Sequence, residues 1–444
     1  MNFPVVEFPW LGNGMVIAII ATIHVLISHG VAVGATALTV SLEHKAYKTN
    51  NKKLDDVARM LTKWILIVTT TAGAMTGVGI WFTTTVIEPA SIGSMLRIFF
   101  WAWFVEWIVF CTEVILIIIY YYTWDKWKDA KKQLHLRIGY ALAVASWLTM
   151  AIIVGILAAK LTPGLWVETL SFWNAFFNPT YLPSLLFRTF VAIVLATSFI
   201  TLIVKFKIKN QELQGDIFSV FSKIMLISLP ALLIFGSWYL SRIPKQAYDQ
   251  IVWSTGMSNN MFTTINIVGL AILIIYTIWA FMKPKKVSTI LGIAVWIACI
   301  GYIGEFEMVR ESVRKPFIIY DYMYANGVLA KNVEMYKTEG YLPQMSFLGV
   351  DEVTEENKYE AGEALYKGQC MACHTIDGWR TKRAFSQRVA GWPEDTLASY
   401  ISTLHETRPF MPPFVGTDKE LEALAHYIAT SANNKEVQRV AKGE

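Results

Sequence analysis

Charged residues are scarce in this sequence: only 16% of its 444 residues are Asp, Glu, Lys or Arg, whereas 54% are hydrophobic. The mean hydropathy is +0.41. This balance excludes a large soluble core and predicts a membrane protein with a polar appendage. The four cysteines are too few to imply a disulfide framework. The first apolar run is long enough to cross a membrane, so no short cleavable signal peptide is expected.

Several apolar segments approach the ~20 residues that a membrane-spanning helix needs. The first, third, fifth and seventh of the loops between them are rich in Lys and Arg, and the second, fourth and sixth loops are nearly free of both. Because basic loops stay in the cytoplasm, both termini are expected outside. The sequence therefore predicts an all-α fold containing a polytopic eight-helix transmembrane bundle, with spans at 14–42, 57–85, 93–123, 134–160, 181–207, 217–241, 259–282 and 287–310.

Histidine is also scarce, and only His24 and His29 of the seven fall in a predicted span, both in the first. This excludes two kinds of membrane haem protein. A haem–copper oxidase needs a site built from six histidines, and a quinol-oxidising dihaem cytochrome b needs four membrane histidines. On a regular α-helix the two side chains point about 140° apart, so they should not bind one iron from the same face. We interpret His29 as a hydrogen-bonded core histidine or as a residue that faces another cofactor.

Near the C-terminus, Cys370, Cys373 and His374 form the C-x-x-C-H pattern of covalent c-type haem attachment. Two thiols one helical turn apart can bond the two vinyl groups of a porphyrin, and the adjacent imidazole then reaches the iron. For C-x-x-C alone, a redox dithiol or half of a zinc site is the alternative. Met411, in a proline-rich turn downstream, is the expected sixth ligand, with a core methionine as the alternative.

The residues around this motif extend the pattern. An amphipathic run at 359–366 precedes it, and residues 418–431 follow as a predicted helix. Together they resemble a class I cytochrome c. The resemblance implies one covalent haem c and a periplasmic location, because attachment in that family occurs outside the cytoplasm. We therefore expect a transmembrane domain at 1–315, a surface connector at 316–352 and a cytochrome c domain at 353–444.

Ionisable residues inside the predicted spans are costly and usually functional. Glu106 and Glu113 lie seven residues apart, which places them about 10 Å apart on one helix face. They suggest a proton route or a haem environment, and a pair of hydrogen-bonded structural acids is the alternative. Arginines near the outer membrane face could clamp haem propionates or extend to the interface. The remaining charges are Arg188 in the fifth span and Glu305, Glu307, Arg310, Glu311 and Arg314 around the end of the eighth.

Four segments of the membrane part resemble, in order, subunit I of the cytochrome bd oxidases. They are IHVL at 23–26, MTGVG at 75–79, Glu113 with Trp124-Asp125 eleven residues later, and ESVRKPF at 311–317. The last is similar to the family's Glu-x-x-Arg-Gln-Pro-Trp. The resemblance implies that His24 ligates a high-spin haem b and that Glu311 ligates the oxygen-reducing haem, with Glu307 as the fallback and Arg314 nearby. The same protein ligands can bind either haem b or haem d as the reactive haem.

Three departures from that family bear on function. The family's low-spin haem b uses a histidine beside an Asn-Pro, but here Asn178-Pro179 is followed by Arg188 at the histidine's position. An arginine offers iron no lone pair, so that haem is expected to be absent or ligated otherwise. The family's quinol-oxidising loop is reduced to about 241–258, so no quinol site is expected in this chain. The ninth helix is replaced by the cytochrome c domain.

The resemblance and its departures together imply a terminal-oxidase-like enzyme of the bacterial inner membrane. Electrons from a periplasmic cytochrome would pass through haem c to one or two b-type haems, or b plus d, where O2 is reduced. Arg310, Arg314 and Arg188 would stabilise propionates or adjust potentials, and Glu106 and Glu113 would deliver protons. The alternative is a non-enzymatic electron-transfer subunit of a larger complex, and a third reading is NO reduction. Subunit-II-like membrane partners are expected, and nucleic acid is not.

Overall fold

The computed structural model of the protein describes residues 6–127, 131–254 and 260–442, and within the helices the side chains of a few residues, Glu311 among them, are outside this description. By its internal contacts the chain divides into two compact units. One, the membrane unit, comprises 22–77 and 99–313. The other, the C-terminal unit, comprises 314–444 together with 1–21 and 78–98. The domain boundaries expected at 315 and 352 stay predictions.

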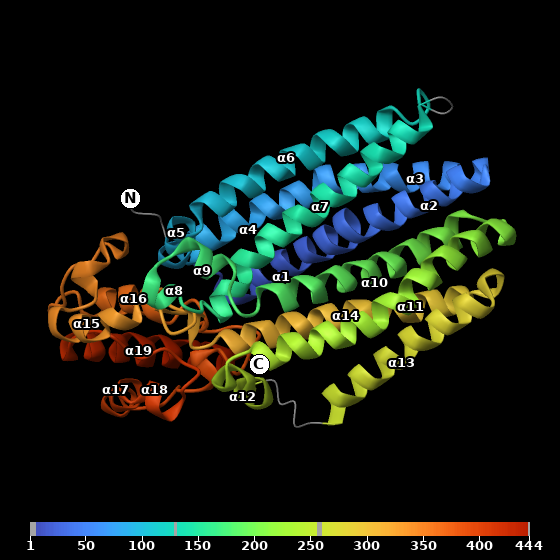
Figure 1. The fold of residues 1–444 in the computed structure, drawn as a ribbon. Helices are drawn as coiled ribbons and strands as arrows, with labels where there is room; N and C mark the ends of the chain where they lie inside the picture. The colour runs from blue at the N-terminus through green and yellow to red at the C-terminus, as the bar shows by residue number, and fades with distance from the viewer. Residues whose placement is uncertain (1–5, 128–130, 255–259, 443–444) are drawn as a thin grey trace. The chain divides into compact units, whose positions relative to one another are not determined.

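The membrane unit is a bundle of long helices (Figure 1). The first two spans each contain an internal π-helical stretch, η1 (Leu26–Ala35) and η2 (Thr69–Gly73). Side chains of Asn51 and Asn210 cap α3 and α11, each accepting a hydrogen bond from the backbone N–H three residues on. The long helices of the chain are α1 (Asn13–Val25), α2 (Thr36–Thr49), α3 (Lys52–Val68), α4 (Ala74–Ile87), α6 (Phe100–Tyr122), α7 (Lys132–Leu161), α10 (Tyr181–Lys207), α11 (Gln211–Arg242), α13 (Asn260–Met282) and α14 (Thr289–Arg314). The larger parts of α1 and α4 belong to the C-terminal unit.

In the described part of the chain, 7 helical stretches are long and apolar enough to cross a membrane. A shorter apolar helix, Asn266–Met282, coincides with the seventh predicted span. The predicted all-α, polytopic architecture is therefore confirmed, with a helix count close to the expected eight. The loops contain the short helices α8 (Trp166–Thr169), α9 (Phe172–Phe176), α12 (Lys245–Ser254) and η3 (Pro284–Lys286).

The third predicted span differs from expectation because it is broken. A separate helix, α5 (Pro89–Ile98), ends before α6 begins, and Phe99 between them has φ −110° and ψ 24°. Phe99 is buried, and its ring packs edge-on against Phe172, with the ring centroids 6.4 Å apart. Neither proline nor glycine marks this break in the sequence. Tertiary packing of an aromatic side chain therefore ends a helix that local composition would continue.

Close helix packing in the membrane unit depends on a glycine. A Cβ added at Gly34, in η1, would lie 2.0 Å from the carbonyl oxygen of Ala192 on α10. Only glycine allows the two backbones to approach this closely. The contact brings the π-helical stretch that contains His29 against the helix that contains Arg188.

The C-terminal unit has its own apolar core between α16 (Lys358–Gln369), α17 (Glu394–Ser402) and α19 (Asp418–Lys442). In the helix predicted at 418–431, the apolar residues Leu424, Ala425 and Ile428 are buried. The other elements are the antiparallel pair β1 (Phe317–Ile319) and β2 (Met323–Tyr324), with η4 (Ala330–Asn332), α15 (Val333–Glu339), η5 (Leu342–Gln344), η6 (Ser346–Leu348), η7 (Phe385–Gln387) and α18 (Leu404–Thr407).

The segment expected to run along the surface, 316–352, contributes to this core. Tyr341 and Leu342 are buried, and their backbone N–H groups donate to the carboxylate of Glu420 on α19 at 2.8–3.0 Å. The sequence did not predict this packing, because segment 316–352 consists of turns and short helices, which have no repeating apolar pattern.

Candidate haem sites

The C-x-x-C-H motif folds as a tight turn at the end of α16. The backbone N–H groups of Cys373 and His374 both donate to the carbonyl oxygen of Cys370, at 3.1 and 2.9 Å. This turn places both thiols and the imidazole along one wall of a cavity. Met411 also lines that cavity, although it lies 37 residues further along the chain than His374. The fold thus brings together all four residues that the sequence analysis assigned to haem c.

The cavity suits a porphyrin. Together with the open solvent at its mouth, it encloses about 1190 Å³. Most of its lining is apolar, with Leu397, Ile401 and Leu404 among the contributors. Basic side chains of Arg383, Arg388 and Lys315 also reach it, as a dianionic propionate pair would require. The lining therefore fits a haem.

His374 is held in the orientation that a metal ligand needs. Its Nδ1 lies 3.2 Å from the carbonyl oxygen of Arg383, and its ring stacks on Phe385 with the centroids 4.9 Å apart. An Nδ1–H that donates to a carbonyl leaves the lone pair on Nε2. Burial lowers the pKa of His374 to about 3, so the imidazole is neutral. Arg383 and Phe385, which the sequence analysis missed, follow the motif without any periodic signal.

The Met411 turn is held in a similar way. The carbonyl oxygen of Met411 lies 2.6 Å from Nδ1 of His405, and its N–H donates to the carbonyl of Arg408 at 2.8 Å. The ring of His405 packs edge-on against Tyr324, with centroids 5.8 Å apart. His405, which the sequence analysis missed, therefore supports the turn that carries the predicted sixth ligand.

In the membrane unit, His24 on α1 faces α4. Its Nδ1 lies 3.1 Å from the hydroxyl oxygen of Thr76, which donates to the carbonyl of Ala72 at 2.7 Å. A Cβ added at Gly77 would approach the His24 ring to 3.2 Å, so the glycine leaves room for the imidazole. The segment that resembled the family's second helix is therefore the one that holds His24. With Nδ1 engaged by Thr76, Nε2 is the nitrogen that would hold a haem iron.

His29 and Arg188 contact each other inside the bundle. Both are buried at 7% exposure, and a terminal guanidinium nitrogen lies 3.3 Å from Nε2 of His29. The guanidinium also lies over the ring of Phe306, 5.2 Å from its centroid. The 140° separation expected between His24 and His29 assumed a regular α-helix, whereas residues 26–35 are π-helical. Even so, the two histidines face different helices, α4 and α10.

The end of α14 carries carboxyl oxygens that are only partly paired. One oxygen of Glu307 forms an ion pair with Arg310, and one oxygen of Glu305 accepts from Asn266 at 2.5 Å. The second oxygen of each carboxylate is buried, with no hydrogen-bond partner among the described residues. Buried oxygens of this kind fit an iron or another cation. The side chain of Glu311 lies outside the described residues, and Arg314, the last residue of α14, forms contacts of its own.

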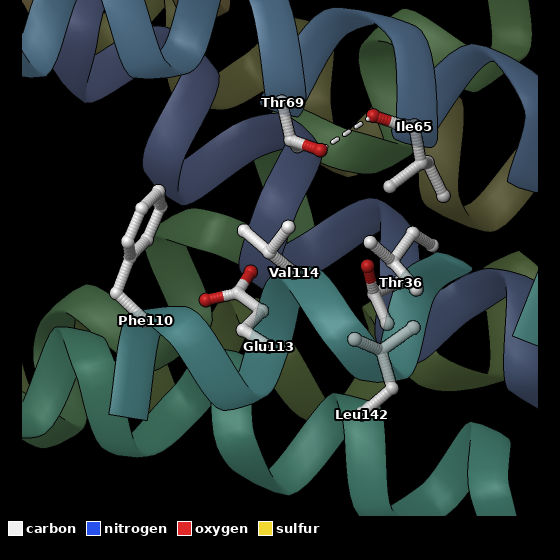
Figure 2. Close-up of a pocket in the computed structure, with 8 residues that line it drawn as sticks. Thr36, Ile65, Thr69, Phe110, Glu113, Val114 and Leu142 are labelled. Atoms are coloured by element: carbon white, nitrogen blue, oxygen red, sulfur yellow. Dashed lines mark hydrogen bonds between the residues drawn. The ribbon is translucent and has the colours of Figure 1, made fainter. Parts of the chain in front are cut away.

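Glu113, one of the two acidic residues on α6, lines a cavity. Its oxygens accept from Ser146 at 2.8 Å and from Thr149 at 3.3 Å, both on α7. Figure 2 shows its carboxyl group pointing into the space, which we call the Glu113 cavity and which Thr36 and Thr69 also line. Glu106, two turns earlier on the same helix, is half-buried. Its part in a proton route stays a prediction.

These features define a polytopic membrane protein that carries a c-type haem domain. The model of the family described as cytochrome bd terminal oxidase subunit I matches residues 15–252, more than half of the chain. The protein therefore belongs to the cytochrome bd terminal oxidase subunit I family. A second model, described as cytochrome c oxidase, cbb3-type, subunit III, matches residues 357–428. No curated protein matches the chain.

The two matches confirm the predicted fusion of a bd-type membrane part with a C-terminal cytochrome c domain. They support haem c and haem b as cofactors and a role in membrane electron transport. The first match ends at residue 252, so α13 and α14 lie beyond it. The roles expected for Glu307, Arg310, Glu311 and Arg314 stay predictions for that reason. The role of Arg188, which lies within the match, also stays a prediction.

Proposed function

We propose that the protein is the haem-bearing membrane subunit of a terminal oxidase that takes electrons from a periplasmic cytochrome and reduces O2. The observation that supports this most directly is the convergence of Cys370, Cys373, His374 and Met411 on one cavity that fits a porphyrin. It gives a bd-family subunit an electron acceptor of its own outside the membrane part. When bound, haem c and haem b supply one-electron redox chemistry.

Residues of the membrane unit would bind the haems inside the membrane. His24 would hold a haem b through Nε2, with Thr76 fixing the imidazole. Glu311, or Glu307 as its fallback, would face the reactive haem, b or d. Arg310 and Arg314 would neutralise propionates. The contact of Arg188 with His29 supports the absence of a third, low-spin haem ligated from the fifth span, because both side chains already engage each other.

The orientation and partners follow from the same proposal. The basic loops support a periplasmic location of the cytochrome c domain, at a bacterial inner membrane. No quinol site is expected at the shortened segment 241–258, so the donor would be a cytochrome or a similar protein. A subunit-II-like membrane partner would complete the assembly. Glu106 and Glu113 would supply the protons that O2 reduction consumes.

The test is a pyridine haemochrome on the purified protein, followed by a CO difference spectrum of the reduced form. We expect one haem c, one or two b-type haems or b plus d, and a CO signal, and then O2 uptake driven by a reduced cytochrome. Haem c with only low-spin haem b and no CO response would contradict the proposal. That result would favour an electron-transfer subunit that links a periplasmic cytochrome to another redox protein.

A further inference from the structure

The segment that precedes the first span, residues 6–12, is hydrogen-bonded to the ends of two spans, and we call it the N-terminal segment. The backbone N–H of Val6 donates to the carbonyl oxygen of Val86 on α4 at 2.9 Å. The side-chain amide of Asn13, the first residue of α1, donates to the carbonyl oxygen of Val6 at 3.0 Å. Its side-chain oxygen accepts from the N–H of Phe8 at 2.9 Å. The N-terminal segment is therefore fixed at the point where the chain enters the membrane.

The depth of this segment follows from the first span. Residues 15–23 contain no charged side chain, as the hydrocarbon region of a membrane requires. Ile19 on α1 and Phe82 on α4 are exposed, as suits apolar side chains that face lipid. Trp10 lies only three residues before Asn13, so the chain allows at most about 11 Å between them. Trp10 consequently lies close to the layer of lipid headgroups.

The loop that follows the C-x-x-C-H motif is held at the same level. Trp379 donates its backbone N–H to the carbonyl oxygen of Trp10 at 3.4 Å and its indole N–H to that of Leu11 at 3.2 Å. Gly378 permits this contact, because a Cβ added there would lie 2.8 Å from the carbonyl oxygen of Trp10. Both chains belong to the C-terminal unit. The haem-binding loop thus packs directly on the segment that enters the membrane.

Aromatic rings and basic side chains are exposed together at this contact. Trp10 and Trp379 are 69% and 49% exposed, and Arg380 and Lys382 are exposed beside them in the chain. The Arg380 guanidinium lies over the Trp379 ring, 5.8 Å from its centroid. We call these four residues the interfacial surface.

The chemistry of the interfacial surface matches that of a membrane interface. Tryptophan rings have an apolar body and a polar edge, so they are enriched at the level of the headgroups. Lys and Arg near a membrane are attracted to anionic lipids. Between 375 and 388 four residues are basic and only Asp377 is acidic, and Asp377 accepts a hydrogen bond from Ser386 at 2.7 Å. The charge of the loop therefore complements an anionic lipid surface.

We propose that the interfacial surface docks on the lipid bilayer, with both tryptophan rings among the headgroups and the two basic side chains paired with anionic ones. An acidic partner protein would match the same charges. Lipid is favoured because Trp379 is hydrogen-bonded to the segment that enters the membrane. The loop also contains Arg383, whose carbonyl oxygen lies 3.2 Å from Nδ1 of His374. Docking thereby fixes the loop that orients the axial imidazole, whether or not O2 is reduced.

The experiment measures how fast a cysteine in the loop reacts with an uncharged polyethylene-glycol maleimide. Thr381, exposed between the two basic residues, is changed to Cys in the full-length, haem-loaded protein. Cys111→Ala and Cys299→Ala remove the two thiols outside the haem motif. The rate of Thr381→Cys modification is compared in three media: nanodiscs of equal parts phosphatidylcholine and phosphatidylglycerol, nanodiscs of phosphatidylcholine alone, and detergent.

We expect Thr381→Cys to react at least about tenfold more slowly in the phosphatidylglycerol nanodiscs than in detergent. Two basic side chains at an anionic surface shift a docking equilibrium by roughly that factor or more. Phosphatidylcholine alone should protect the cysteine less. Thr396→Cys, at an exposed threonine on α17, is the matched control and should react at the same rate in all three media.

A second pair of variants separates the basic side chains from net charge. Adding Arg380→Gln and Lys382→Gln should remove the difference between the two nanodisc compositions. Adding Lys419→Gln and Lys435→Gln instead makes the same change in charge at two exposed lysines of α19, and the difference should persist. The haem c spectrum of every variant is recorded to show that its site is loaded.

Three results would overturn the assignment to lipid. They are equal Thr381→Cys rates in phosphatidylglycerol nanodiscs and in detergent, protection of Thr396→Cys as strong as that of Thr381→Cys, and equal loss of protection in the two charge variants. Full protection by phosphatidylcholine alone would overturn the pairing with anionic headgroups. A cysteine that both nanodiscs leave reactive, but that an added acidic cytochrome protects, would assign the surface to a protein donor instead.

Discussion

The two units build their candidate haem sites in opposite ways. In the C-terminal unit, three of the four expected ligands sit within five residues, Cys370 to His374, and a single turn sets their geometry. In the membrane unit, His24, Arg188 and Glu307 come from three helices far apart in the sequence. The first site is local and the second depends on the packing of the whole bundle. Local sites can be identified from sequence with confidence, whereas distributed ones need the fold.

The comparison extends to the polar residues that hold each unit together. The C-terminal unit buries mainly aromatic and aliphatic side chains, with Glu420 as a charge satisfied by backbone N–H groups. The membrane unit instead buries a set of mutually paired side chains, Glu43, Asp55, Lys132 and His135, which we call the buried ionic cluster. Within the hydrocarbon region water is not available to satisfy such groups, so each must find a partner in the protein. The membrane unit should consequently be the more sensitive of the two to loss of one charge.

The largest effect is expected from the double change Cys370→Ala and Cys373→Ala. Because both thioether bonds would be lost, no haem should remain attached to the denatured chain, and haem staining of a denaturing gel measures this. The membrane haems should stay, since their site is distributed over other helices. Cys111→Ala, in the membrane unit, is the matched control and should keep the covalent haem. Covalent haem on the double variant would refute the assignment of the motif.

Next in size is Lys132→Met, which removes the ammonium and leaves Glu43 and Asp55 buried without it. Breaking a buried ion pair from one side costs about 3–5 kcal/mol, so the thermal unfolding midpoint of the protein in detergent should fall sharply. Lys245→Met is the control, because the pair of Lys245 with Asp249 is exposed at 88% and 53% and should contribute no more than about 1 kcal/mol. Equal effects of the two changes would show that the cluster is not structural.

What the sequence could predict follows the same division. The C-x-x-C-H turn, Met411 and the apolar face of the last helix were predictable, because spacing and periodicity encode them directly. The spans were predictable from apolar length. By contrast, Lys132 lies in a basic loop and His135 at the start of the predicted span 134–160, and neither position predicts a buried partner. Their pairing with Glu43 joins positions 43, 132 and 135, and no local pattern connects them.

Other features that the sequence did not predict also have specific physical causes. The helix break at Phe99 depends on a ring 73 residues away in the chain, Phe172. The contact between His29 and Arg188 depends on the close approach that Gly34 permits. The core packing of Tyr341 depends on the carboxylate of Glu420. In each case a distant partner decides the local structure, as is usual where tertiary contacts override intrinsic preference.

Met411→Ala tests the one non-local ligand of the otherwise local site. A thioether ligand raises the potential of a haem whose other ligand is histidine. We expect the midpoint potential of haem c to fall by on the order of 0.1 V, within the ~0.8 V range that axial ligands span, and its absorption spectrum to change. Met345→Ala, a half-buried methionine packed against the same core, is the control. An unchanged spectrum would remove Met411 as a ligand and leave it as a core residue.

Arg188→Leu tests the distributed site. His29 would lose the guanidinium that faces its Nε2, and an unsatisfied buried acceptor costs about 1–3 kcal/mol. The unfolding midpoint should fall moderately, while the ratio of haem to protein stays that of wild type. Arg242→Leu, at the exposed end of α11, should change the midpoint little. Loss of a low-spin haem b from an otherwise folded Arg188→Leu protein would show that this region does hold a haem.

The smallest effect concerns Glu7, which joins the N-terminal segment to the C-terminal unit. The hydroxyl of Tyr366 donates to Glu7 at 3.1 Å, yet burial outweighs this bond and raises the pKa of Glu7 above its ordinary value of 4.5. The folded state therefore binds its proton more tightly than the unfolded state. Stability from this group is fully present below pH ~4.5 and is lost as the pH rises through the folded pKa.

Glu7→Gln removes that titration while keeping an oxygen that can accept from Tyr366. We expect the variant to be stabilised by less than about 1 kcal/mol at neutral pH and to lose the part of the pH dependence between pH 4.5 and neutrality that Glu7 causes. The Soret absorbance of haem c, followed through thermal unfolding at several pH values, reports on this unit alone. An unfolding profile of Glu7→Gln parallel to wild type at every pH would mean that Glu7 is solvated. The N-terminal segment would then add nothing to the local site, and the contrast with the distributed site would be sharper still.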